Sequence, residues 1–295
     1  MFRPITAAVL IGLALHGAGQ GIPFDLQRPV RVYPLPGELR EISALTDVDA
    51  HTVACLHDEA ARLYHFDLRE GRVTGSFHFG GPGDMEGLSH VRGEYFALRS
   101  DGLLYRLGLK AGGAVLRDTL RIALPQDDLE GLGHDPVDDV LLVAPKGVVK
   151  GSPRSRDVRR VHGYDLRTGR VLPRPVLHLS VDGIAAEARR RGLALPMKTT
   201  DKGRVVPALK LRLSSVAVDP VTGHYHLLSA TDRVLVTVDR QGDLVDLHVL
   251  DAARCPKPEG ITFLPGGDML LCTEGEGMPG TILRYARITP PVRNR

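Results

Sequence analysis

A short pattern recurs five times along the chain and constrains its fold more than any other feature. Each copy places a polar residue, a small residue and an apolar residue before an apolar run: Ser43-Ala44-Leu45, Glu86-Gly87-Leu88, Glu130-Gly131-Leu132, Ser214-Ser215-Val216 and Glu259-Gly260-Ile261. The first members of successive copies are 43, 44, 84 and 45 residues apart. A period in the forties with four short strands per unit is typical of β-propeller blades. The sequence therefore predicts an all-β chain folded as a propeller.

The second repeat shows the order expected within a blade. Apolar alternation and β-branched residues predict strands over residues 86–91, 95–99, 103–109 and 118–123. The 84-residue interval is long enough to hide another blade, but it contains two inserts. Residues 146–160 form a basic loop, and residues 182–191 form a short helix with Asp182 as N-cap and Gly192 as its stop. We favour five blades with a decorated third blade over the alternative of six, within one propeller domain over residues 29–290.

The first twenty residues have the composition of a signal peptide. Arg3 precedes an apolar run over residues 5–15, and small residues follow it. No later segment is long and apolar enough to span a bilayer. We expect a periplasmic or secreted protein without a transmembrane segment. Such a compartment allows one disulfide among Cys55, Cys255 and Cys272, and the alternative is that all three are buried thiols.

Composition argues against nucleic acid as the partner. The formal net charge is only +3, aromatic residues make up 5% of the chain, and Trp is absent. A chain of this kind lacks the basic footprint and the aromatic stacking platforms that single-strand binders use.

Antiparallel order within a blade brings many carboxylates to one mouth of the channel. The start of strand one and the turn between strands two and three lie on the same face. The small residue after each strand-one start would let neighbouring blades approach where the ring is narrowest. The metal-ligand candidates at or near the strand-one starts are Glu86, Glu130, Glu259, Glu41 and Ser214, and Asp84 and Asp128 lie two residues before a repeat Glu. The ligand-binding candidates at the next turns are Asp58, Glu59, Lys146 and Glu274.

Crowded carboxylates repel one another, since two unit charges 4 Å apart cost about 4 kcal/mol at an effective dielectric constant near 20. Some must then hold protons, or a cation must lie among them. Oxygen ligands without converging His or Cys favour Ca²⁺ over Mg²⁺. The alternative is that each Glu only forms a hydrogen-bonded latch to the neighbouring blade.

The two inserts leave from this same face and are basic. They would suit an anionic small molecule, such as a phosphate ester, or a protein partner on the loop face. The alternative is a solvated, charged lid with no ligand.

The repeat residues, together with Glu41-Ile42-Ser43, His57-Asp58-Glu59, Ala144-Pro145-Lys146-Gly147 and Thr273-Glu274-Gly275-Glu276-Gly277, resemble the SdiA-regulated propeller family. The likeness covers about residues 30–287. It implies an exported bacterial propeller, in some members with bound calcium, whose biochemical role is largely unassigned. A looser likeness is to the esterase-like phytase propellers, although Ser214 stands where a Glu would be expected.

Two functions compete at this point. The first is a ligand- or partner-binding module that holds a divalent cation, with calcium expected, at the acidic mouth. The alternative is a metal-dependent hydrolase of an anionic phosphate ester, in which Glu86, Glu130 and Glu259 hold the metal. In that case Glu59 or Glu274 would act as base and Lys146 would bind the anion. No nucleophile elbow, phosphate-cradling loop or zinc spacing appears in the sequence.

Overall fold

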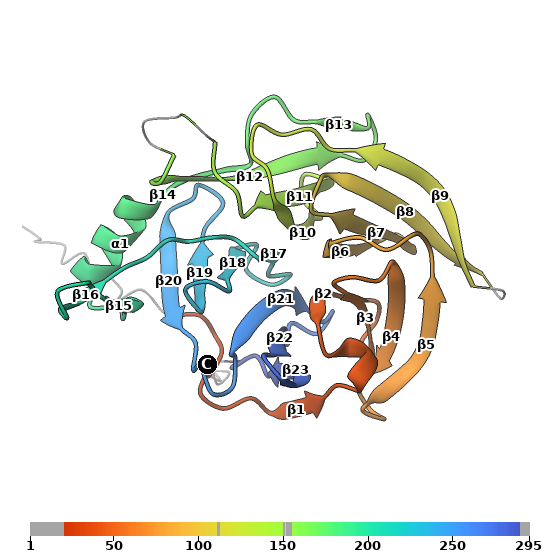
Figure 1. Ribbon diagram of the computed structural model, residues 1–295, viewed down its shortest axis with the longest axis horizontal. Helices are drawn as coiled ribbons and strands as arrows, with labels where there is room; N and C mark the ends of the chain where they lie inside the picture. Colours follow the sequence, from red (N-terminus) through yellow and green to blue (C-terminus); the bar gives the residue numbers. More distant parts are fainter. Residues whose placement is uncertain (1–20, 111–112, 150, 152–154, 290–295) are drawn as a thin grey trace, which may run out of the picture.

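Five antiparallel sheets surround a central axis and form the blades of a propeller (Figure 1). This computed structural model describes residues 21–110, 113–149, 151 and 155–289. The predicted five-bladed β-propeller is confirmed, and the long interval holds insertions in place of a sixth blade. Blades are numbered by the order of their innermost strands in the sequence.

The first two blades are regular four-stranded sheets. Blade one consists of β2 (Ile42–Asp47), β3 (Thr52–His57), β4 (Arg62–Asp67) and β5 (Arg72–His78). Blade two consists of β6 (Met85–Val91), β7 (Glu94–Arg99), β8 (Leu103–Lys110) and β9 (Gly113–Arg121). The expected order of strands in blade two is confirmed, but its fourth strand begins earlier than predicted because β9 pairs with the full length of β8.

The third blade has a divided outer edge, and the fourth is regular. Blade three consists of β10 (Leu129–Asp135), β11 (Val140–Pro145), β12 (Val158–Asp165), β13 (Arg170–Val171) and β14 (Leu177–Ser180). β13 and β14 pair with different halves of β12. Blade four consists of β17 (Ser215–Val218), β18 (Tyr225–Ser229), β19 (Val234–Val238) and β20 (Leu244–Val249).

Blade five joins the two ends of the described chain. It consists of β21 (Lys257–Phe263), β22 (Met269–Gly275), β23 (Met278–Tyr285) and, as its outermost strand, β1 (Arg31–Pro34). β1 pairs antiparallel with β23, and the 3₁₀ turn η1 (Gly37–Leu39) leads on towards blade one. An N-terminal strand therefore completes the last blade and closes the ring.

Each seam between neighbouring blades has its own apolar cluster. The cluster between blades one and two includes Leu56 and Met85, for example, and the one between blades four and five includes Leu228 and Leu271. The innermost strands contact one another in the order β2, β6, β10, β17 and β21, and β21 returns to β2. Both faces of most strands are thus buried, which fixes the relative positions of residues at the channel mouth.

The insert after blade three forms one helix and one small hairpin. Helix α1 (Val181–Arg190) begins one residue earlier than predicted, and its N-cap is Ser180 and not Asp182. The Ser180 hydroxyl accepts the Gly183 N–H, so it meets an unpaired amide that Asp182, already inside the helix, cannot cap. Gly192 stops the helix as predicted, with φ +69°. The strands β15 (Met197–Thr199) and β16 (Val205–Pro207) form the hairpin.

The described chain begins at residue 21 and packs into the propeller before the predicted domain start. The predicted signal peptide, residues 1–20, lies outside the described residues. Phe24 and Leu26, before the predicted domain start at residue 29, pack in the seam of blades four and five. All three cysteines are buried free thiols, which confirms the alternative to a disulfide. Within the described ranges, no helix is long and apolar enough to cross a membrane.

Candidate functional site

β-Bulges deliver the first residue of the repeat to the channel mouth. The pairing of the first two strands shifts register around Ser43, Glu86, Glu130 and Glu259 in blades one, two, three and five. A bulged residue is left out of the ladder and its side chain is re-aimed. The same local irregularity, repeated in four of the five blades, therefore places one polar side chain from each of these blades at the narrow end.

The small residue after each bulge allows neighbouring blades to approach. A methyl group on Gly87 would lie 2.6 Å from Cβ of Leu132 and 2.7 Å from the Glu130 carbonyl oxygen. One on Gly260 would lie 2.6 Å from Cδ2 of Leu45 in blade one. The glycines thus confirm the sequence argument that close packing at the ring centre requires a small residue here.

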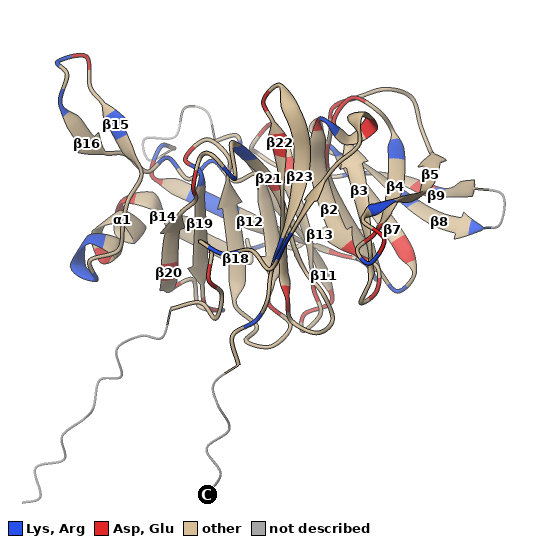
Figure 2. Cartoon of the chain, turned by 90° about the horizontal axis from the view of Figure 1, so that it is seen from below, with Lys and Arg blue, Asp and Glu red and all other residues tan. Residues whose placement is uncertain are grey.

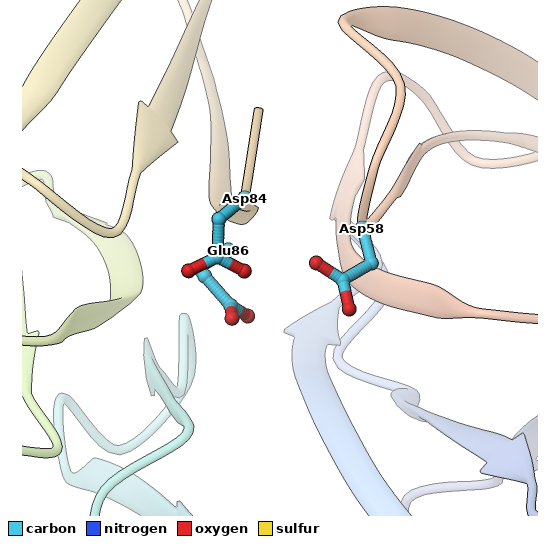
Figure 3. Close-up of side chains that lie close together, drawn as sticks. All are labelled: Asp58, Asp84 and Glu86. Carbon is cyan, nitrogen blue, oxygen red and sulfur yellow. The ribbon is translucent and has the colours of Figure 1, made fainter. Parts of the chain in front are cut away.

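Three carboxylates from blades one and two meet at this mouth. Asp58 follows β3, Asp84 precedes β6, and Glu86 occupies the bulge of β6. One oxygen from each lies within 4.8 Å of the others, so the three could hold a metal ion. Figure 3 shows Asp58 reaching across from its own blade towards the Asp84 and Glu86 carboxylates. We call these three residues the carboxylate triad.

Backbone hydrogen bonds fix the triad in place. The Met85 N–H donates to the Asp58 carbonyl across the seam of the two blades, at 2.7 Å. The Asp58 N–H donates to the carbonyl of Glu41, and the Ser100 N–H donates to that of Asp84. The peptide groups on which the three side chains stand are therefore set by the ring itself.

Crowding shifts the protonation of the triad strongly. Burial, followed by the charges of Glu130, Asp58 and Asp84, raises the pKa of Glu86 to about 10. Burial and the adjacent Asp84 raise the pKa of Asp58 to about 7. Burial also opposes the charged form of Asp84, but hydrogen bonds with Ser100, Asp58 and Glu86 lower its pKa overall. Without a cation, Glu86 therefore holds a proton at neutral pH, Asp58 is close to the midpoint of its titration, and Asp84 is ionised.

The other two repeat glutamates are matched by lysines. Glu130, 2% exposed, forms an ion pair with Lys146. Lys257 bridges Glu259 and Glu274, with Nζ–Oε1 distances of 3.1 and 2.9 Å. Burial raises the pKa of Glu130, to about 8, and that of Glu259, while the adjacent lysines act in the opposite direction. In blades three and five, lysines thus offset the charge of the repeat glutamates, whereas no described lysine forms an ion pair with the carboxylate triad.

The remaining predicted site residues lie apart from the triad or have other partners. Glu41, with its side chain 49% exposed, lies 3.8 Å from the His57 ring. The Ser214 hydroxyl donates to the Pro258 carbonyl at 3.1 Å, which links blades four and five. Glu59 is exposed and outside the triad. Ser43, at the bulge of blade one, has a buried hydroxyl oxygen without a hydrogen-bond partner in the described structure.

Asp84 and Lys257 were not among the candidate ligands chosen from the sequence, although the repeat contains the signal for both. Asp84 precedes Glu86 by two residues, as Lys257 precedes Glu259. The two residues therefore occupy equivalent places in blades two and five, one with a negative and one with a positive charge. Aligning this position across the repeats would have shown the lysine of blade five, whereas blade three carries Asp128 there and its glutamate pairs with Lys146 after β11.

The helix and hairpin after blade three stand beside the channel and not over it. Figure 1 shows α1, β15 and β16 at the outer edge of blade four, and Figure 2 shows the hairpin projecting on the side of the β22–β23 turn. Two arginines of the predicted basic inserts have structural roles. Arg159 donates to the Leu211 and Lys210 carbonyls, and Arg191 donates to those of Leu244 and Val245. Neither α1 nor the hairpin forms the expected basic cover.

Comparison with solved structures supports the fold. The chain is similar to the crystal structure of Myxococcus xanthus glutaminyl cyclase, with a TM-score of 0.53 and 12% sequence identity. The match covers 88% of this chain and 95% of that chain. No protein-family model matches the chain, and no curated protein matches it. At this identity the likeness shows the propeller fold alone.

Proposed function

We propose that this protein is an exported propeller that binds Ca²⁺ at the triad of Asp58, Asp84 and Glu86. The metal-loaded mouth then serves as a ligand- or partner-binding surface. The observation that carries the proposal is the convergence of three carboxylates from two blades, none of which forms an ion pair with a lysine of the described residues. A divalent cation would replace the protons that crowding otherwise retains on Asp58 and Glu86.

The donor set fits a hard cation. All three side chains offer carboxylate oxygens, the ligands that Ca²⁺ prefers, and neither His nor Cys belongs to the group. Ca²⁺ accepts six to eight oxygen ligands, so backbone carbonyls and water would complete the shell. The resemblance to the SdiA-regulated family, in which some members bind calcium, and the signal-like first twenty residues support calcium and export respectively.

A binding role is better supported than hydrolysis of an anionic ester. Lys146 and Lys257 at the mouth are already paired with glutamates, and α1 and its hairpin stand beside the mouth at the outer edge of blade four. An anion approaching the mouth would therefore meet mostly carboxylates.

Metal analysis and calorimetry test the proposal. Mature protein purified without added metal is assayed for bound elements, and the chelated protein is then titrated with CaCl₂. We expect one Ca²⁺ per chain and loss of binding in Asp84→Asn. Saturation at 100 times the Kd stabilises a folded protein by about 2.7 kcal/mol, which raises the Tm by roughly 5 °C for a chain of this size.

Glu59→Gln is the matched control, because Glu59 neighbours Asp58 in sequence yet lies outside the triad. It should retain wild-type affinity. Absence of metal, no change of Tm on chelation and no heat of calcium binding would together refute the proposal and leave the triad as a set of protonated latches.

A further inference from the structure

A cavity lies at the rim of the face that carries the acidic mouth, between the β22–β23 turn, β1 and the link from blade four to blade five. Its volume is 490 Å³, within the range of small-molecule sites. The wall is largely apolar and rigid, formed by Pro34, Pro256 and Pro279 together with Met278. Met278 is 69% exposed, so its side chain is accessible to a ligand that enters the cavity.

The turn that forms one wall is tightly constrained. A side chain on Gly275 would overlap the Met278 carbonyl, and Gly277 has φ +101°, which favours glycine. Glu276, between them, is held at φ +44°. The Gly-Glu-Gly sequence thus fixes the backbone from which the exposed Glu276 side chain extends beside the proline wall.

The charges around this cavity do not cancel. Arg254 is occupied, since it donates to the backbone and side-chain oxygens of Gln27 and pairs with Asp251 at 2.9 Å. Glu274 is paired with Lys257. Glu276 has no hydrogen bond or ion pair from its side chain to any described residue. Its carboxylate therefore remains available beside an apolar wall, and Figure 2 shows acidic residues at this hairpin tip.

From this combination we propose that the rim cavity binds an organic ammonium ion with a small apolar body. The apolar part packs against Met278 and the prolines, and the ammonium group meets Glu276. A carboxylate next to an apolar wall favours a primary amine over both a neutral isostere and an anion, since only the amine gains the charge interaction. This site goes beyond the proposed calcium site and does not depend on it, although Glu274 borders both.

Ligand-observed ¹⁹F NMR tests the proposal with three fluorophenyl probes of similar size, of which the amine and the alcohol have the same shape. The probes are 4-fluorobenzylamine, 4-fluorobenzyl alcohol and 4-fluorobenzoate, each titrated with full-length mature protein at pH 7.5. We expect the amine to bind about three- to fivefold more tightly than the alcohol, the size of one exposed charge pair, and the benzoate to bind most weakly. Glu276→Gln should remove the preference for the amine, and Met278→Ala should weaken the amine and the alcohol together.

Asp201→Asn is the control, because it removes one exposed negative charge from the distant β15–β16 hairpin. It should leave all three affinities unchanged, and melting curves establish that each variant is folded. Equal binding of amine and alcohol, stronger binding of benzoate, no effect of Glu276→Gln, or no binding at all would each overturn the proposal. Repeating the titration with Asp84→Asn and with chelator separates the two sites: amine binding should persist when calcium binding is lost.

Discussion

The two halves of the acidic mouth stabilise their buried carboxylates in different ways. In blades three and five, each repeat glutamate is buried against a lysine, as in Glu130–Lys146 and Glu259–Lys257. In blades one and two, Glu86 meets Asp58 and Asp84 instead, and the pKa values of Glu86 and Asp58 rise accordingly. Buried charge must be paired, protonated or bound to a cation. Lysines of the chain pair with the glutamates of blades three and five, whereas the carboxylates of blades one and two need protons or a bound metal ion.

Removing a lysine from blade five should have the largest effect on the free energy of unfolding. Lys257→Met leaves Glu259 and Glu274 without their shared cation, and we expect a loss of about 3 kcal/mol in the free energy of unfolding. This is the low end for a broken buried pair, because the lysine side chain is 38% exposed. Chemical denaturation measures the loss. The triple change Lys257→Met, Glu259→Gln and Glu274→Gln should recover much of the lost stability. If Lys257→Met alone were as stable as wild type, the ion pairs of Lys257 would not be needed to stabilise the buried glutamates.

Converting the triad into a paired site should abolish calcium binding. Asp84→Lys places a lysine where blade five carries Lys257, two residues before the repeat glutamate. We expect no heat of calcium binding and loss of the roughly 2.7 kcal/mol that saturating calcium would supply. In chelator, the same variant should be more stable than wild type at pH 8, because Glu86 gains a partner. Retained calcium binding would contradict the equivalence of the two positions.

Substituting the glycines after Glu86 and Glu259 tests whether the two halves of the mouth differ in packing as well as in charge. The backbone is alike at these places, since both strands shift register at the repeat glutamate. Gly87→Ala and Gly260→Ala each press a methyl group against the next blade, and we expect each to cost about 2 kcal/mol. Gly266→Ala is the control, because a methyl group there meets nothing within 4 Å. Thermal melts compare the three. Markedly unequal costs at Gly87 and Gly260 would mean that the blades differ in packing as well as in charge.

The last effect expected is a pH dependence of the metal-free protein. The raised pKa values of Asp58 and Glu86 mean that the folded chain holds protons that the unfolded chain releases near pH 4. The Tm in chelator should therefore fall as pH rises from about 5 towards 10. Saturating calcium should flatten this slope between pH 6 and 9. Differential scanning calorimetry at each pH measures it, and an equal slope with and without calcium would count against the triad as its origin.

Part of this molecule follows from the sequence because the repeat is periodic. The spacing of Glu86, Glu130 and Glu259 predicts blades, the antiparallel order within a blade predicts that these residues share one mouth, and the glycines after them predict close approach of neighbouring blades. Each of these conclusions depends only on chain geometry that is the same in every blade. For that reason the repeat alone is enough to predict the propeller and its acidic mouth.

The tertiary structure decided what distinguishes one blade from the next. In the sequence, Glu86, Glu130 and Glu259 are equivalent, and only the packed ring shows that lysines reach two of them while Asp58 reaches across a seam to the third. It also decided that β1 closes blade five, that Ser180 caps α1, and that α1 and its hairpin stand beside the mouth. These outcomes depend on contacts between residues distant in the chain, and a local pattern carries no record of such contacts.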